Sequence, residues 1–217
     1  MIWAYHQNLQ SLGSRKRAGQ MPRLVDHEQR RREITTAART VIATGGLDAA
    51  TFQAVAAEAG ISVRLIQYYF GTKRDLMLAT HTAVVADFGV GFTEQFTALG
   101  PEATPREIIR TFAVGLLPLD ERRRQDNLVF AAFHAANLTG NTVTSEEMMG
   151  APRYLVNVIT EQLLRARGAE SDAHAAELDA ELIVGGVSSI TQFVLAGGAT
   201  RERAVELLDR LLDRMLL

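Results

Sequence analysis

Apolar residues recur every three to four positions along most of the chain, and the breaks in this pattern fall at glycine and proline. This period is typical of amphipathic helices, and the strict alternation of a half-buried strand is missing. The pattern therefore predicts an all-α protein. We expect helices over residues 27–44, 52–59, 63–70, 73–96, 105–117, 120–138, 145–167, 172–195 and 200–217.

Local capping signals set the limits of the first four helices. Gly45-Gly46 can end the first helix, because glycine adopts the positive φ that a helix stop requires. Each of the four helices follows a residue whose side-chain oxygen can accept a hydrogen bond from the free N–H groups of the first turn. These predicted N-caps are Asp26, Thr51, Ser62 and Thr72.

The second and third helices are separated only by the turn AGIS, residues 59–62. A short turn with glycine at a position of positive φ is typical of a helix-turn-helix. On one side of the third helix, an arginine can bond a guanine edge, an amide an adenine edge, and a valine can touch a thymine methyl. The same residue types also occur on ordinary solvated faces. The outward residues are Val63, Arg64, Gln67 and Tyr68, and the inward ones are Leu65, Ile66, Tyr69 and Phe70.

Charge is divided unevenly along the chain. Residues 1–80 hold 11 Lys/Arg and 6 Asp/Glu, a net charge of +5, and residues 81–217 have a net charge of −7. A basic front half and an acidic back half indicate that the front half faces a polyanion. Double-stranded DNA is the partner that this charge and the helix-turn-helix favour together.

Composition excludes several other classes. The chain has no cysteine, so a disulfide framework and a thiolate metal site are ruled out, and a reducing cytoplasm is the expected location. Metalloprotease, di-iron, P-loop and dinucleotide-binding patterns are missing, and the five histidines are scattered. We therefore expect no catalytic residues, no metal and no cofactor. A helical-bundle enzyme is the remote alternative.

The N-terminal residues 1–25 are expected to form a flexible extension. They lack the continuous apolar core of a signal peptide, and Met21 is an alternative start of the native chain. No stretch of the sequence approaches the roughly 20 apolar residues of a membrane span, so no membrane partner is expected.

The span from about Arg30 to Leu78 resembles the DNA-binding domain of TetR-type bacterial transcriptional regulators, and the matching features lie in ITTAARTVIATGGLDAATFQAVAAEAGISVRLIQYYFGTKRDLMLA. The preceding MPRLVDHEQRRREI and the QYYF segment look like the branch that includes the choline-responsive repressor BetI. The resemblance implies about nine helices, with a helix-turn-helix domain over residues 26–72 and a regulatory and dimerisation domain over residues 73–217. It also implies a homodimer on a palindromic operator that a small-molecule effector releases. The alternative is a DNA-binding regulator controlled by a partner protein.

The resemblance assigns roles in DNA binding residue by residue. Many relatives carry a small residue where Arg64 stands, so Arg64 either reads a base or contacts the backbone. The expected base readers are Val63, Arg64, Gln67 and Tyr68, and the expected phosphate contacts are Thr51, Ser62, Tyr69 and Lys73.

The back half carries the expected dimer interface and effector pocket. Small residues on one late helix and a wide leucine stripe on the last favour a four-helix interface, at Gly185, Ser189, Leu208 and Leu212. Gly185-Gly186 departs from the Asp-Gly that this branch often carries. A pocket needs an apolar lining with a few polar groups, and the aromatic-rich middle helices predict a bulky, largely apolar effector, although each aromatic can instead be plain core. The candidates are Phe88, Phe92, Phe112, Phe130, Phe133, His134, Asn137 and Tyr154.

Overall fold

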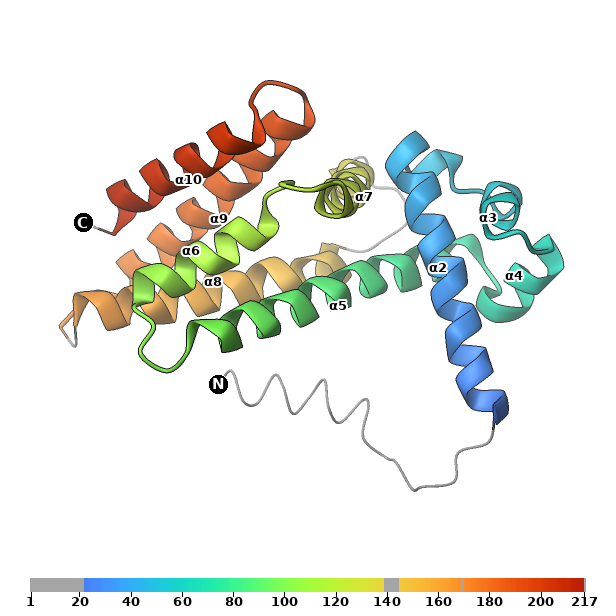
Figure 1. Ribbon diagram of the computed structural model, residues 1–217, viewed down its shortest axis with the longest axis horizontal. Helices are drawn as coiled ribbons and strands as arrows, with labels where there is room; N and C mark the ends of the chain where they lie inside the picture. Colours follow the sequence, from blue (N-terminus) through green and yellow to red (C-terminus); the bar gives the residue numbers. More distant parts are fainter. Residues whose placement is uncertain (1–21, 139–144, 169, 217) are drawn as a thin grey trace.

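The computed structural model describes residues 22–138, 145–168 and 170–216 (Figure 1). Within these ranges all regular secondary structure is helical, as the hydrophobic pattern predicted. Most of the predicted N-terminal extension lies outside the described residues. The helices are α2 (Pro22–Ala49), α3 (Phe52–Ala59), α4 (Val63–Phe70), α5 (Lys73–Leu99), α6 (Pro105–Leu116), α7 (Glu121–Leu138), α8 (Ser145–Arg167), α9 (Ala173–Leu195) and α10 (Arg201–Met215).

The helices form two groups joined by α5. In Figure 1, α2, α3 and α4 lie together at one end of the molecule, and α6, α8, α9 and α10 form a bundle at the other. The long helix α5 runs from the first group to the second, and α7 packs against α2 between them. A movement in the bundle can therefore reach the three-helix unit through α5 or α7.

The capping residues act as the sequence indicated, except at the first helix. Thr51 Oγ1 accepts a hydrogen bond from the backbone N–H of Ala54, and Ser62 Oγ accepts one from Leu65. Thr72 caps α5 in the same way. The predicted cap at Asp26 is wrong, because α2 already begins at Pro22, and proline suits a first helical turn since it has no N–H to leave unpaired.

Glycine sets the two breaks of the three-helix unit. Gly46 has φ 77° and interrupts α2 where the glycine pair predicted a stop. Gly60 has φ 65° and ψ 32°, a left-handed conformation that ends α3 and starts the short turn into α4. The turn thus fixes the angle at which α4 leaves α3.

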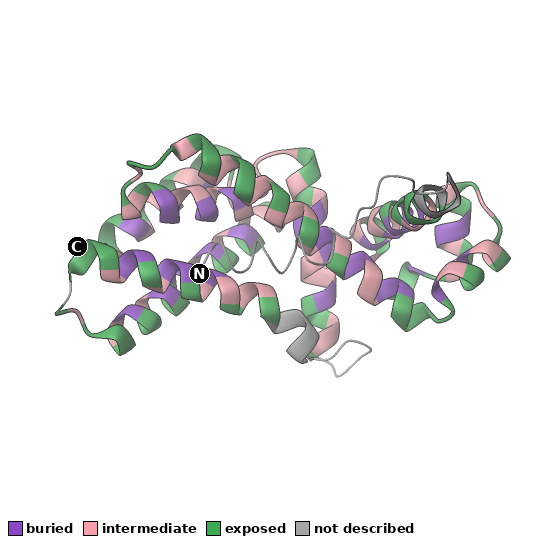
Figure 2. Cartoon of the chain, turned by 90° about the horizontal axis from the view of Figure 1, so that it is seen from below, coloured by how far each residue is buried: buried purple, intermediate pink, exposed green. Residues whose placement is uncertain are grey.

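Buried side chains form one core around the three-helix unit and a second within the bundle (Figure 2). A smaller third cluster, which includes Ile108, Phe112, Leu155 and Val158, lies between α6 and α8. The first core includes Ile34, Ile66 and Phe70, together with Leu76 of α5 and Phe133 of α7. The unit therefore does not close its core with residues 26–72 alone, although α5 begins at the predicted boundary. The second core joins α6, α8, α9 and α10 through Ile109, Leu163, Ile183, Leu208 and Leu212, among others.

The side of α10 that was predicted to form the dimer interface packs against the chain's own bundle instead. Leu208 and Leu212 are fully buried in the chain's own core, so the prediction that they form a dimer surface is wrong. Together with Ala204 they follow an i, i+4, i+8 spacing that turns one stripe of α10 onto its neighbours. Gly185 and Ser189 on α9 are exposed, which leaves them available to a partner.

Two helices, α5 and α9, are long and apolar enough to cross a membrane by length and composition. This finding differs from the expectation that no stretch is apolar enough to span a membrane. However, core helices of soluble proteins can have the same length and hydropathy. Both helices turn one side into a core of this chain, α5 with Leu76 and Val84 and α9 with Ile183 and Val187.

We predict opposite stability effects for the same substitution at two glycines. Gly60→Ala lowers the free energy of unfolding by about 1 kcal/mol, because an alanine at φ 65° is strained. Gly89→Ala inside α5 raises it by about 0.5 kcal/mol, because alanine loses less backbone entropy in a helix. An added Cβ meets nothing within 4 Å at either site.

Urea unfolding at one fixed protein concentration measures both effects. A Gly60→Ala variant as stable as the unmodified chain would contradict the argument from backbone conformation.

Candidate nucleic-acid interface and regulatory pocket

The outer face of α4 carries polar side chains that no neighbouring helix covers. Ile66 and Phe70 are buried in the first core, and Arg64, Gln67 and Tyr68 are exposed on the other side of the helix. Tyr68 is 73% exposed. Val63 is only half-exposed and packs against the core with Ile66 and Phe70, three and seven residues on, so its predicted place on the reading face is not supported.

The predicted phosphate contacts surround this face. Thr51 and Ser62 are exposed at the N-termini of α3 and α4, where free backbone N–H groups and the helix dipole attract anions. Lys73 is exposed at the first position of α5. Tyr69 is half-buried, and its ring lies 4.5 Å from the ring of His27. The predicted backbone contacts thus flank the predicted base readers, as a groove-binding helix requires.

Arg31 has a role that sequence reasoning missed. Its Nη1 donates a hydrogen bond of 2.5 Å to the backbone oxygen of Tyr69, and its guanidinium lies 4.2 Å from the ring centre of Phe70. A cation at the last turn of α4 is favoured by the helix dipole. Arg31 therefore holds the end of α4 on α2.

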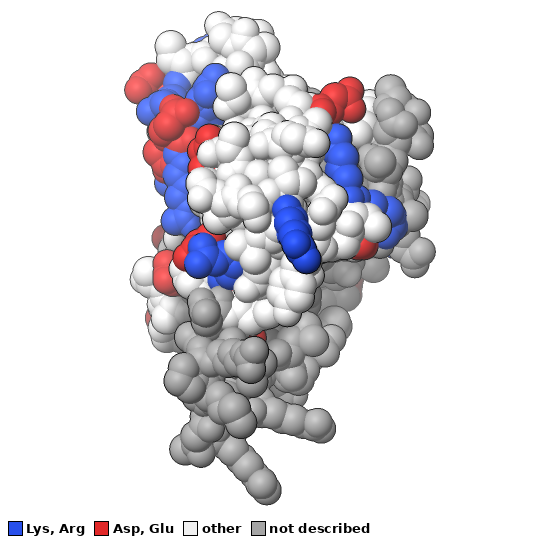
Figure 3. All heavy atoms as spheres, turned by 90° about the vertical axis from the view of Figure 1, so that its right-hand side faces the viewer, with Lys and Arg blue, Asp and Glu red and all other residues white. Residues whose placement is uncertain are grey.

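Charge on the α3–α4 end is arranged around a largely uncharged face. Figure 3 views this end and shows Lys and Arg at its centre and along both sides, with Asp and Glu confined to the sides. A duplex can therefore approach the centre without meeting carboxylates.

These features define the class: a helix-turn-helix protein whose second helix presents an exposed reading face to DNA. Residues 34–80 match the family model of bacterial regulatory proteins, tetR family. The match covers the three-helix unit, which is therefore a DNA-binding domain of the tetR type. The relatives described below are transcriptional regulators and not enzymes, and they support a TetR-type regulator.

Several transcriptional regulators are similar to the chain in sequence. PksA of Bacillus subtilis is 26% identical over 162 residues, which cover 73% of this chain and 77% of PksA. BetI of Vibrio campbellii is 27% identical over 216 residues, covering 90% of this chain and 96% of that protein. BetI of Brucella anthropi is 40% identical, but only over 90 residues, 41% of this chain and 44% of that protein.

Solved structures share the whole fold. A transcriptional regulator from Rhodococcus sp. Rha1 superposes with a TM-score of 0.70 at 24% identity, over 86% of this chain and 95% of that one. The multidrug-binding protein EbrR, complexed with imidazole, gives 0.54 at 24% identity over 84% and 94%. FadR of Bacillus subtilis, in complex with stearoyl-CoA, gives 0.58 at 17% identity over 85% and 96%.

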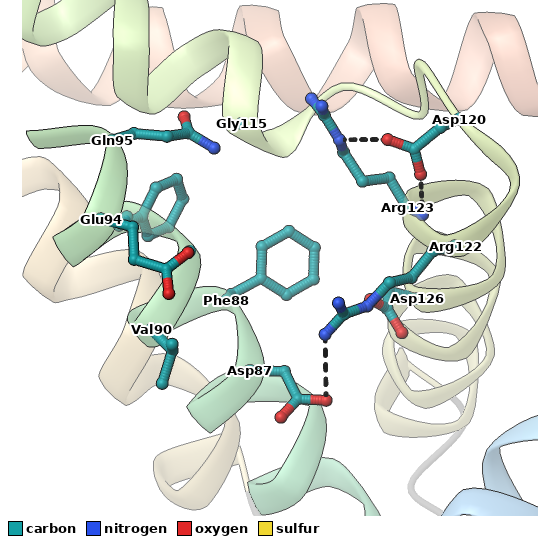
Figure 4. A pocket seen from close by; sticks show the side chains of 12 residues that line it. Asp87, Phe88, Val90, Glu94, Gln95, Gly115, Asp120, Arg122, Arg123 and Asp126 are labelled. Carbon is teal, nitrogen blue, oxygen red and sulfur yellow. Dashed lines mark hydrogen bonds and ion pairs between the residues drawn. The ribbon is translucent and has the colours of Figure 1, made fainter. Parts of the chain in front are cut away.

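A pocket of about 340 Å³ lies between α5 and the start of α7, with α6 at its edge (Figure 4). This volume is at the small end of the range of roughly 300–1,000 Å³ that is typical of small-molecule sites. The lining residues are Asp87, Phe88, Val90, Gly91, Phe92, Glu94, Gln95, Gly115, Asp120, Arg122, Arg123 and Asp126.

The predicted pocket residues divide between this site and the core. Phe88 and Phe92 line the pocket. Behind them, Phe130 lies 5.3 Å from the ring of Phe88, and Phe112 lies 5.1 Å from the ring of Phe92. Phe133 is buried in the first core, His134 is exposed, and Asn137 and Tyr154 do not line this pocket. The pocket is also more polar than the predicted apolar lining.

A charge cluster joins this pocket to the three-helix unit. Arg39 of α2 is largely buried, and its guanidinium lies 2.7 Å from Asp87 Oδ2 of α5 and 3.2 Å from Asp126 Oδ1 of α7. Burial raises the pKa of Asp126, and the charge of Arg39 lowers it only in part. No local pattern indicates this cluster, because Arg39, Asp87 and Asp126 are far apart along the chain.

A second ion pair, between Asp120 and Arg123, lies at the other side of the pocket. Arg123 Nε lies 2.7 Å from Asp120 Oδ2, and the backbone N–H of Arg123 donates to Asp120 Oδ1. That backbone hydrogen bond, with the Arg123 charge, lowers the pKa of Asp120. Asp120 and Arg123 therefore neutralise each other at the wall of the pocket.

We predict that two substitutions on α4 change base preference and one on α5 does not. Arg64→Ala and Gln67→Ala each relax preference at a defined operator position, by roughly 1–3 kcal/mol per lost bidentate contact. Lys73→Ala weakens binding to all sequences alike and lowers the salt dependence, because it removes one phosphate contact.

Binding to a panel of single-base operator variants at several salt concentrations measures these effects. Arg153→Ala removes an exposed arginine from α8 and serves as the matched control. If Arg64→Ala and Gln67→Ala both kept the full preference for the same site, neither side chain would be a base reader.

Proposed function

We propose that the protein is a cytoplasmic transcriptional repressor that binds a palindromic operator as a homodimer and is released by a small-molecule effector. The observation that carries the proposal is the exposed face of α4, on which Arg64, Gln67 and Tyr68 stand free of intramolecular cover. A single reading helix contacts only a few base pairs, so two related copies are needed for a specific site.

An apolar stripe on α9 supports the homodimer. Leu178, Leu182 and Phe193 are exposed large apolar side chains, and Leu182 is 62% exposed. They lie on one side of α9 with the exposed Gly185 and Ser189 between them, so a second helix can approach closely at the middle of the stripe. We place the dimer contact on this α9 stripe, defined by these five residues, because exposed apolar faces of this kind mark interaction sites.

The pocket between α5 and α7 supports control by a small molecule. It combines aromatic walls with charged groups, the composition of a ligand site. The multidrug-binding protein EbrR and FadR, which share the fold, were each solved with a bound small molecule. A regulator controlled by a partner protein would not need such a pocket, so the small-molecule proposal is favoured.

Two steps test the proposed function. The purified protein is first mixed with a pool of random DNA duplexes, and the bound sequences are recovered and compared. A recovered site with two-fold symmetry supports the proposal, and the absence of any preferred sequence contradicts it. Metabolites are then screened for those that lower the affinity for the recovered site.

We predict that Leu182→Glu dissociates the homodimer, because it places a charge within the apolar α9 stripe. The monomer should bind the operator much more weakly, since each α4 then binds a half-site alone. Leu138→Glu is the matched control, because Leu138 is 75% exposed on α7 outside the stripe. Molar mass by light scattering and operator binding measure the outcome, and a Leu182→Glu variant that stays dimeric would place the interface elsewhere.

A further inference from the structure

The pocket between α5 and α7 has an aromatic side and an acidic side. Phe88 and Phe92 form the aromatic side, with their ring centres 6.1 Å apart. Asp87, Glu94 and Asp126 line the same pocket, and Figure 4 shows Asp87 and Glu94 near Phe88. A ligand that fits both sides must combine an apolar group with a group that carboxylates attract.

The charges around the pocket leave an excess of carboxylate. Asp120 is neutralised by Arg123. Arg122 is mostly exposed, and its guanidinium lies 3.7 Å from Asp87, beyond hydrogen-bond distance. Glu94 forms no hydrogen bond or ion pair with any residue in the described part of the chain. With Arg39 included, four carboxylates face three guanidinium groups, so the site favours an added positive charge.

Asp126 is the most buried of these carboxylates. Its side chain is only 6% exposed, and its Oδ1 accepts no hydrogen bond within the described structure, although Arg39 lies 3.2 Å away. A buried carboxylate oxygen without a hydrogen bond is costly. A donor that enters the pocket and reaches Asp126 would therefore gain more than a donor at the surface.

Arg39 connects these carboxylates to the three-helix unit. It lies on α2, whose first half also holds α4 through Arg31, and it is paired with Asp87 of α5 and Asp126 of α7. A positive charge bound between Asp87 and Asp126 would take the place of Arg39. The ion pairs that hold α2 against α5 and α7 would then be lost.

We propose that the effector is a protonated amine that carries an apolar ring, and that its ammonium group displaces Arg39 from Asp87 and Asp126. The ring lies against Phe88 and Phe92, and the ammonium N–H groups donate to the carboxylates. This inference rests on the proposed function, because it names the class of effector and the route by which that effector changes the position of α2.

The pocket distinguishes this class from two others. A quaternary ammonium has no N–H to donate to Asp126, and the described pocket offers phenylalanine in place of the Trp and Tyr that such ligands prefer. For a carboxylate ligand, Arg122 is the one arginine lining this pocket that forms no short ion pair with a described residue. The ligand would also lie beside the like charges of Glu94 and Asp87. An amine is the class that the excess of carboxylate favours.

Three indole compounds of similar shape test the charge preference. Tryptamine carries an ammonium group, tryptophol a hydroxyl and indole-3-propionate a carboxylate. We expect tryptamine to bind the full chain at least about tenfold more tightly than either of the others, measured by titration calorimetry in the absence of DNA. Equal binding by the three, tighter binding by the carboxylate, or no saturable binding of tryptamine would overturn the proposal.

Matched variants locate the site. Glu94→Gln should weaken tryptamine binding several-fold and should not affect folding, because Glu94 is exposed and has no partner among the described residues. Glu161→Gln, the same change at an exposed position of α8, is the control. Asp87→Asn should weaken binding more strongly than Glu94→Gln, and unchanged affinity in both pocket variants would place the amine elsewhere.

The competition with Arg39 has its own measurement. Arg39→Met should bind tryptamine more tightly than the unmodified chain, whereas Arg39→Lys, which keeps the charge, should not. In the unmodified chain, tryptamine should lower operator affinity by the same factor by which operator DNA lowers tryptamine affinity. Tryptamine binding that leaves operator affinity unchanged would overturn the displacement of Arg39.

The outcomes separate this inference from the proposed function. A protein that binds a palindromic site but shows no preference for tryptamine would retain the proposed function and lose the amine effector. A protein that binds tryptamine in the pocket but selects no DNA sequence would lose the proposed function instead.

Discussion

The burial of Ile66 and Phe70 determines which side of α4 faces outward. These two side chains insert into the core formed by α2, α3, α5 and α7, and each contributes roughly 1.5–3 kcal/mol by leaving water. Because α4 is only eight residues long, the orientation of these two residues fixes all the others. Arg64, Gln67 and Tyr68 are exposed for that reason. The hydrogen bond from Arg31 to Tyr69 then holds the end of the helix in place.

The contact between the three-helix unit and the rest of the chain contains charged groups as well as apolar side chains, which distinguishes it from the cores. Apolar packing of Leu76 and Phe133 is combined there with charged groups: Arg39 and Asp126 are largely buried, and Asp87 is half-exposed. Buried ion pairs add little net stability, because desolvation offsets most of the attraction, but breaking one by removing a partner is costly. This charged contact therefore fixes the position of α2 relative to α5 and α7. A ligand group that competes for one of its charges can change that position.

In the bundle, the division between internal core and outer surface follows individual helix faces. Leucines on α10 close the chain's own core, and leucines on α9 point outward. Gly186 shows how closely these two helices approach, since a Cβ there would lie 2.6 Å from Leu211. The small residues that the sequence suggested for a dimer contact thus serve two purposes: Gly186 admits α10, and Gly185 and Ser189 lie in the exposed stripe.

The sequence alone determined α3, α4 and the start of α5, because the signals that set these limits are local, whereas the start of α2 at Pro22 was missed. Thr51, Ser62 and Thr72 bond to backbone groups three residues away, and Gly60 needs only its own φ. The helical period predicted that Arg64 and Gln67 are exposed, once the turn before α4 was recognised. Val63 was wrongly predicted to face outward, because it lies at the edge of the buried face, where the period does not distinguish buried from exposed positions.

Only the tertiary structure decided which of several equivalent apolar stripes faces the core and which charges meet. Leu182 and Leu208 are the same residue type on similar helices, and their opposite burial depends on how α9 and α10 pack on α6. Arg39 and Asp87 are 48 residues apart, and nothing in the local pattern of either indicates a partner. Ion pairs and helix-face choices of this kind arise from long-range packing, whereas caps and turns are set by the residues beside them.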